Sequence, residues 1–394
     1  MLGLLAGAEL LAMSLWFTGS AVAPELAARW SLEPAEAAWF TGIVQLGFVA
    51  GTAVAAVLNL ADLLPARRYF TLAALAGAAA NAALAFVPGF GGALAVRFLT
   101  GFFLAGVYPP AMKMIATWFR GARGLAIGTI VGALTVGKAM PYLARAVPGA
   151  RVEDIVLAAS VGALVAAGVV AVGYRDGPFP FARRPFSWGL AVAVARHRET
   201  RLAIGGYLGH MWELYAMWTW VGGFVAASAA SRAAAGAGGG AIAASGLELF
   251  GFGAIAVGGL GCVWGGWAAS RVGYERVAMG AMAASGACAA ATALLFGASP
   301  WLLAPVLLVW GFFVVADSAQ FSALVTEVAP SHAVGTALTL QTSLGFLLTL
   351  ATIHGVPLAA EAFGWRWAFP GLAIGPALGI LAIRRLRRLR AAGA

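Results

Sequence analysis

The chain has 394 residues, of which 62% are hydrophobic and only 10% are charged, and its mean hydropathy is +0.89. Water-soluble domains carry roughly 25% charged residues, so this composition excludes a soluble globule and predicts a polytopic membrane protein. The net charge of +10 could suggest a nucleic-acid partner, but its distribution along the chain indicates a topological role instead.

Apolar runs recur along the chain, each long enough to cross a hydrocarbon core about 30 Å thick as a helix. In chain order they cover residues 2–24, 36–60, 69–88, 92–117, 124–145, 154–174, 202–228, 247–269, 277–297, 300–325, 334–356 and 364–383. The first run is too long for a removable signal peptide and lacks a basic flank and a small-residue cleavage site. The predicted fold class is therefore all-α, with twelve transmembrane helices.

The basic residues are distributed unevenly between the two sides of these spans. Seventeen of the 25 fall on one side, five fall on the other, and three lie within spans. This asymmetry follows the positive-inside rule and predicts that both termini are cytoplasmic.

The first span contains a carboxylate, Glu9, and its surroundings recur in the seventh span. Residues 9–19 match residues 213–223 at six positions, including Glu9 with Glu213 and Trp16 with Trp220. We therefore expect two six-helix bundles, residues 1–174 and 202–394, joined by a Pro- and Arg-rich linker, residues 175–201. Parallel repeats of this kind place the substrate path at their interface, near the bilayer midplane.

Three further stretches are informative: NLADLLPARR after the second span, RFLTGFFLAG in the fourth, and GWAASRVGYER after the eighth. They resemble the loop and fourth-helix motifs of the major facilitator superfamily, and the resemblance covers essentially the whole chain. It implies two six-helix bundles related by a pseudo-two-fold axis along the membrane normal. It also implies a cytoplasmic latch formed by the residues that match the loop motif, namely Asp62, Arg67, Arg68, Gly266, Arg271 and Gly273. In the second copy Ser270 replaces the Asp.

Within the superfamily, the chain is similar to bacterial nitrate/nitrite porters, and we expect a bacterial inner-membrane location. Those proteins bind the anion between arginines of the second and eighth helices. Residues 36–60 and 247–269 contain no Arg, so that substrate is not expected here.

Ionisable side chains within spans indicate a polar interior, because each costs roughly 2.5–3.5 kcal/mol at a helix centre. The candidates for substrate binding or proton coupling are Glu9, Arg97, Lys138, His210, Glu213 and Asp317, with Met13, Trp16, Met217 and Gln341 as further cavity-lining candidates. The resemblance associates Arg97 with proton coupling.

Glu9 and Glu213 are expected to face each other across a central cavity, where a carboxylate away from water can bind and release protons. The alternative is that each accepts hydrogen bonds that hold helices together. Lys138 either contacts an anionic substrate group or pairs with one of the acids. For Asp317 the two alternatives are a role in transport and structural pairing with an Arg or Lys. The glycines of the fifth span, Gly124, Gly128, Gly132 and Gly137, predict close helix packing.

No phosphate-binding loop and no nucleophile–base set is present, so an enzyme is not expected. Neither a cofactor nor a metal site is expected. The sequence favours a monomeric secondary active transporter that moves a small organic or anionic solute by alternating access and couples to protons. An exporter of cationic drugs or metal ions is the alternative, and a transporter-like sensor is a remote one.

Overall fold

The computed structural model describes residues 1–119, 123–179, 188–236, 244–330 and 332–393, and the regular structure in them is helical. The helices of the first half are α1 (Leu2–Met13), α2 (Thr18–Trp30), α3 (Pro34–Ala37), α4 (Trp39–Val57), α5 (Leu60–Leu63), α6 (Ala66–Ala83), η1 (Leu84–Phe86), α7 (Phe90–Leu104), α8 (Tyr108–Ala116), α9 (Arg123–Arg145) and α10 (Val152–Gly173). Those of the linker and second half are α11 (Trp188–Arg196), α12 (Arg198–Ala234), α13 (Ala244–Ala256), α14 (Gly258–Val272), α15 (Tyr274–Leu295), α16 (Pro300–Ala316), α17 (Ser318–Val328), α18 (Val334–Phe363), α19 (Trp365–Ala368), η2 (Pro370–Ala373) and α20 (Ile374–Gly393).

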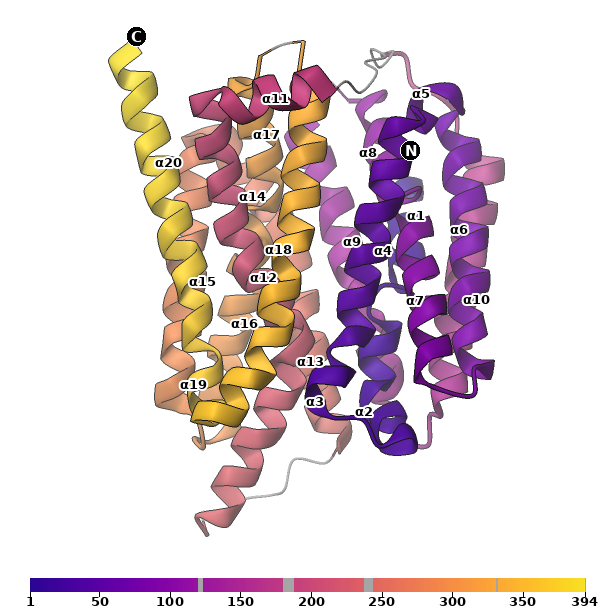
Figure 1. Cartoon of the computed structure of the whole chain (residues 1–394), viewed down its shortest axis with the longest axis vertical. Coiled ribbons are helices and arrows are strands. Elements are labelled where there is room, and N and C mark those ends of the chain that lie inside the picture. The colour runs from indigo at the N-terminus through magenta and orange to yellow at the C-terminus, as the bar shows by residue number, and fades with distance from the viewer. Residues whose placement is uncertain (120–122, 180–187, 237–243, 331, 394) are drawn as a thin grey trace.

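Eleven helical stretches of the described chain are long and apolar enough to cross a membrane. The predicted seventh span is not among them, because the Trp, Tyr, His and Glu side chains of α12 reduce its hydropathy. This helix nevertheless has 37 residues and runs the whole height of the molecule (Figure 1). It continues to Ala234, beyond the predicted end at 228. Residues 237–243, which follow it, lie outside the described part.

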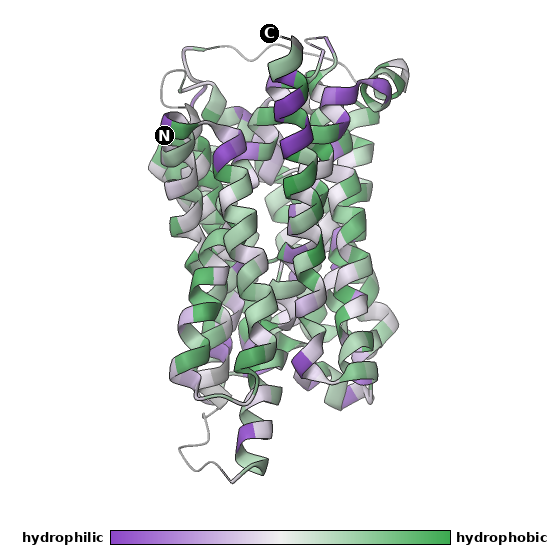
Figure 2. Cartoon of the chain, turned by 90° about the vertical axis from the view of Figure 1, so that its left-hand side faces the viewer, coloured by the Kyte–Doolittle hydropathy of each residue, from purple (hydrophilic) through white to green (hydrophobic). Residues whose placement is uncertain are grey.

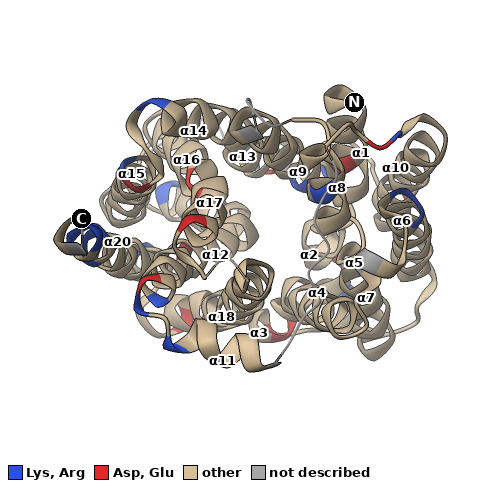
Figure 3. Cartoon of the chain, turned by 90° about the horizontal axis from the view of Figure 1, so that it is seen from above, with Lys and Arg blue, Asp and Glu red and all other residues tan. Residues whose placement is uncertain are grey.

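The helices form two groups when the molecule is seen from above (Figure 3). Along one side of their junction α9 packs against α13 and α14, and along the other side α4 packs against α18. The predicted class, an all-α membrane protein of two bundles, is confirmed by this arrangement. The second, fifth, eighth and eleventh spans supply most of the helix contacts between the bundles.

Both chain ends lie toward the same end of the molecule, the upper end in Figures 1 and 2. We call this end the terminal face and the other end the opposite face. Within the expected linker, α11 lies across the terminal face and packs against α12 and α18 (Figure 1). Residues 180–187 of that linker lie outside the described part.

The outer surface of the bundles is apolar. Val172, Leu294 and Trp301 are 87%, 85% and 88% exposed, which would be unfavourable in water and is expected against lipid. Figure 2 shows hydrophobic residues along the height of the helices and a concentration of hydrophilic residues at the terminal face.

Several spans predicted as continuous helices are interrupted, the twelfth among them by η2. The first breaks at residues 14–17, the fourth at residues 105–107, the eighth at Val257 and the tenth at Asp317. The break in the fourth span precedes a Pro-Pro pair at the start of α8, where proline removes backbone donors. Irregular backbone at membrane depth is tolerated where protein surrounds it, so we expect the backbone polar groups freed at these breaks to be paired inside the bundles.

Candidate substrate site between the two bundles

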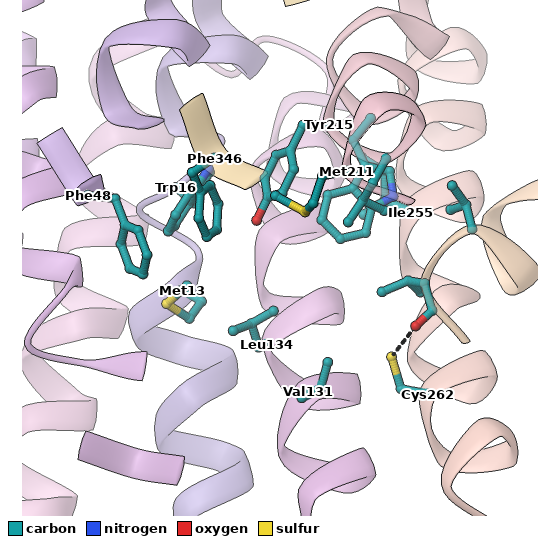
Figure 4. Close-up of a cluster of buried hydrophobic side chains, with 14 of the residues drawn as sticks. Met13, Trp16, Phe48, Val131, Leu134, Met211, Tyr215, Ile255, Cys262 and Phe346 are labelled. Atoms are coloured by element: carbon teal, nitrogen blue, oxygen red, sulfur yellow. Dashed lines mark hydrogen bonds between the residues drawn. The ribbon is translucent and has the colours of Figure 1, made fainter. Parts of the chain in front are cut away.

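Aromatic side chains from both bundles meet at the middle of the interface. Trp16, in the break between α1 and α2, lies 5.0 Å from Phe48 of α4 and 5.5 Å from Phe346 of α18, measured between ring centroids. Tyr215 of α12 lies 5.3 Å from Phe346. Figure 4 shows these rings together, with Met13 beneath Trp16. The structure therefore places two predicted lining residues, Met13 and Trp16, where the bundles touch.

Lys138 of α9 reaches this aromatic cluster from the side. Its ammonium nitrogen lies 4.0 Å from the ring centroid of Trp16, 4.7 Å from that of Tyr215 and 5.5 Å from that of Trp218. It also donates a hydrogen bond to the Tyr215 hydroxyl. Cation–π contacts of this kind strengthen when water is excluded, and the Lys138 side chain is only 2% exposed. The Lys138 amino group is thus held at the junction of the two halves.

Glu9 of α1 is buried, and neither carboxylate oxygen has a hydrogen-bond partner in the described part of the chain. It lies one helical turn before Met13, on the face that leads to Trp16, and Lys138 is the basic group with which it interacts electrostatically. The indole nitrogens of Trp16 and Trp218 are likewise buried without partners among the described residues. Buried polar groups are normally paired, so one acceptor group and two donors beside Lys138 are available to a bound solute or to water.

Glu213 does not face Glu9 across the interface, and that expectation is wrong. Its carboxylate accepts hydrogen bonds from the Trp310 indole of α16 and, at 2.8 Å, from the Ser285 hydroxyl of α15. Met211 and Tyr215, two positions before and after it on α12, point to the interface (Figure 4), so Glu213 points into its own bundle. Met217 follows one turn later on the Glu213 face. Glu213 therefore fits the alternative reading, a carboxylate that holds helices together.

His210 and Asp317 form a second buried polar cluster inside the C-terminal bundle. The Nδ1 atom of His210 lies 2.9 Å from an Asp317 carboxylate oxygen, and its Nε2 atom lies 2.9 Å from the Ser318 hydroxyl. Both side chains are at most 2% exposed, and Asp317 occupies the break between α16 and α17. Gln341 of α18 is also buried, and its amide oxygen has no hydrogen-bond partner in the described chain. The structural pairing considered for Asp317 thus involves a histidine rather than Arg or Lys.

Arg97 of α7 binds the backbone at the break in the first span. Its guanidinium donates hydrogen bonds to the backbone carbonyls of Leu15 and Trp16, and to the Asn81 side chain at 2.9 Å. The Asn81 amide in turn donates to the Val156 carbonyl of α10 at 3.1 Å. These contacts give Arg97 a structural role in holding the irregular backbone beside Trp16. Sequence reasoning missed Asn81, since an uncharged residue in the third span carries no comparable signal.

Glycines bring α9 and α14 into backbone contact across the interface. A Cβ atom would lie 2.8 Å from the Cys262 carbonyl oxygen if built on Gly128, and 2.7 Å from that of Gly259 if built on Gly132. Gly266, from the second copy of the loop motif, faces Gly124 in the same way at 2.9 Å. Gly137 instead packs against α1. The close packing expected for the glycines is therefore found between the bundles at Gly128 and Gly132, and within the N-terminal bundle at Gly137.

The rest of the expected latch is only partly described. Arg67 and Arg68 are exposed at the start of α6, and the Asp62 side chain lies outside the described part. Gly273 ends α14 with φ at +88°, a conformation that favours glycine. Arg271 stacks on the Trp267 ring, with 4.1 Å between the guanidinium carbon and the ring centroid.

The two ends of the interface differ. At the opposite face, Arg145 of α9 pairs with Glu25 of α2 and, at 2.7 Å, with Glu248 of α13. Trp39 and His354 also meet there, with ring centroids 4.4 Å apart. At the terminal face a cavity of about 150 Å³ lies mainly in the N-terminal bundle, lined by residues of α4, α6 and α8 and by Ala105, and Thr339 of α18 borders it from the other bundle. An ion pair thus bridges the bundles at the opposite face, whereas the terminal face has this cavity beside the glycine contacts of α9 and α14.

Two helix bundles that meet along one long interface are the architecture of a membrane transporter. The model of the Major Facilitator Superfamily matches residues 4–353, and the chain belongs to that superfamily. It is a transporter and not an enzyme.

Individual relatives are more distant. The chain is 37% identical over 91 residues to a protein called niacin transporter NiaP, from Acinetobacter baylyi, a match that covers 23% of this chain and 20% of that protein. The matched segment thus spans about a fifth of that curated relative.

Three solved structures share the fold. A bacterial homologue of the human lysosomal transporter Spinster, in an inward-facing and unoccupied conformation, matches with a TM-score of 0.73 at 14% identity, covering 98% of this chain and 97% of that one. The nucleoside transporter NupG matches with a TM-score of 0.72 at 13% identity, covering 98% and 99%. The human organic anion transporter MFSD10 matches with a TM-score of 0.68 at 15% identity, covering 97% of both chains.

Proposed function

We propose that this transporter moves a small organic anion, bound at Lys138 between the two bundles, and couples its movement to protons through Glu9. The observation that carries this proposal is the buried ammonium group of Lys138 within a ring of aromatic side chains at the interface. A carboxylate attached to a planar ring suits this surface best. The carboxylate pairs with Lys138, and the ring stacks on the aromatic side chains.

Unpartnered donors support an anion rather than a cation. The indole N–H groups of Trp16 and Trp218 are buried without acceptors among the described residues, and a carboxylate would accept from them. Glu213, which a cation exporter would need at the interface, is turned into its own bundle. The relative NiaP is called a niacin transporter. Niacin is a small aromatic carboxylate, so its chemistry agrees with an organic anion as the substrate.

Proton coupling follows from the charges that the buried site holds. Lys138 balances either the ionised Glu9 or the substrate carboxylate, and two negative charges beside one ammonium group repel each other in a low-dielectric interior. Substrate binding and protonation of Glu9 therefore favour each other, which links anion and proton in one transport step. On this proposal the terminal face, where the basic residues gather, is cytoplasmic.

The test is uptake into proteoliposomes of radiolabelled nicotinate and benzoate, with tetraphenylphosphonium as the cationic probe, each with and without a pH gradient. In Lys138→Met, loss of one charge-assisted hydrogen bond, about 1.5–3 kcal/mol, should weaken anion binding roughly 10- to 150-fold. Glu9→Gln should abolish gradient-driven uptake and leave anion exchange intact. Glu213→Gln is the matched control at the repeat-related position and should retain gradient-driven uptake.

Three results would contradict the proposal. They are transport of the cationic probe alone, unchanged anion transport by Lys138→Met, and gradient-driven uptake that survives in Glu9→Gln. The first would favour the exporter of cationic compounds that the sequence left as the alternative.

A further inference from the structure

A groove unrelated to the substrate site lies on the outer surface of the C-terminal bundle, between α14 and α15 at the terminal face. It has a volume of about 330 Å³. Trp264 and Trp267, 37% and 46% exposed, form one wall. Gly280 of α15 hollows the other wall, because nothing lies within 4 Å of the position a Cβ would occupy. The groove is therefore largely apolar and opens on the outer surface of the bundle, where lipid is expected.

Two arginines, Arg271 and Arg276, line the end of this groove at the terminal face. In the described part of the chain, neither has a carboxylate within ion-pair distance. The neighbouring Glu275 is directed away, since it pairs with Arg387 and Arg390 of α20 at 3.2 and 3.0 Å. The sequence supplies a reason for the missing partner: Ser270 stands where the loop motif has an Asp, and its hydroxyl bonds to the backbone of Trp267.

Arg271 is held in position by its neighbour. Its guanidinium carbon lies over the Trp267 ring, 4.1 Å from the centroid, and no carboxylate of the described chain occupies its N–H groups. Guanidinium groups bind phosphate through such edges with two parallel hydrogen bonds. Tryptophan is also typical of the headgroup region of a bilayer. Positive charge and apolar groove thus meet at the level of lipid headgroups.

We propose that this groove binds an anionic phospholipid, with the phosphate at Arg271 and Arg276 and an acyl chain between Trp264, Trp267 and Gly280. Charge complementarity selects an anionic over a zwitterionic lipid, by about fivefold for each arginine near the membrane surface. Phosphatidylglycerol should therefore bind roughly 25-fold more tightly than phosphatidylcholine.

The experiment is native mass spectrometry of the full chain in detergent, titrated with phosphatidylglycerol or phosphatidylcholine, with occupancy of the first bound lipid as the readout. Arg271→Gln/Arg276→Gln should lose the preference for phosphatidylglycerol. The control Arg384→Gln/Arg388→Gln removes the same charge from exposed positions on α20 at the same face and should keep the preference. Gly280→Leu fills the groove without changing charge, and it should lower binding of both lipids.

An unchanged preference in the double variant at the groove would overturn the proposal, and so would equal loss in the α20 control. Unchanged lipid binding by Gly280→Leu would overturn it independently of how the arginine variant folds. Displacement of the lipid by inorganic phosphate alone would show that the arginines bind a free anion instead, and would also reject it.

Discussion

The glycine contact between α9 and α14 leads to a prediction about the balance between conformations. In Gly128→Ala/Gly132→Ala, two new methyl groups would lie 2.8 and 2.7 Å from backbone carbonyl oxygens of α14, whereas ordinary contact begins at 3.4 Å. The helices must separate by about 0.6–0.7 Å, because backbone atoms cannot turn aside as a side chain can. Overpacking of this kind costs about 1–3 kcal/mol.

That cost applies to the conformation in which the two helices touch. A penalty of about 2 kcal/mol changes the ratio of touching to separated conformations about 30-fold. Alanine also gains about 1 kcal/mol in helix propensity over glycine in every conformation. Gly168→Ala and Gly355→Ala are matched controls for this gain, since nothing lies within 4 Å of a Cβ at either position.

Pulsed electron paramagnetic resonance can measure the separation. Spin labels at Leu125 and Ser270, both exposed near the terminal face, report on α9 and α14 in a background without Cys262 and Cys288. We expect longer distances in the double variant than in either control, together with a lower Tm. If the distances and Tm of the double variant match those of the controls, the contact does not govern how the bundles separate.

Further variants test the remaining contacts. Arg97→Met removes donors from three buried acceptors at about 1–3 kcal/mol each, so its Tm should fall well below that of the exposed control Arg67→Met; an equal Tm would exclude the structural role. Glu213→Leu leaves the Trp310 and Ser285 donors without their acceptor and should lower the Tm. Glu213→Gln keeps one acceptor oxygen and should lower the Tm less. The reverse order of Tm values would contradict these hydrogen bonds. Arg145→Gln should speed maleimide labelling of a cysteine introduced at position 20, because the ion pairs that close the opposite face are lost. The control Arg151→Gln, whose ion-pair partner is on its own helix, should not change the labelling rate. Equal labelling rates in the two variants would refute the closure.

The spans, the two halves and the presence of buried ionisable groups could all be predicted from the sequence, because hydropathy and repetition are properties of local segments. The internal repeat indicated that the bundles pair, and the glycines of the fifth span indicated close packing. The composition of Lys and Arg was equally informative: Lys138 is one of two lysines in the chain, and it occupies the interface.

The direction in which each buried group points was decided by the tertiary structure. Glu9 and Glu213 occupy equivalent places in the repeat, yet Lys138 lies near the first, while Trp310 and Ser285 bind the second. The break at residues 14–17 depends on Arg97, more than 80 positions away along the chain. Rotation of a helix about its axis, and the backbone groups that a break exposes, are determined by the neighbours that pack around it. Those neighbours come from distant parts of the chain, and no local pattern specifies them.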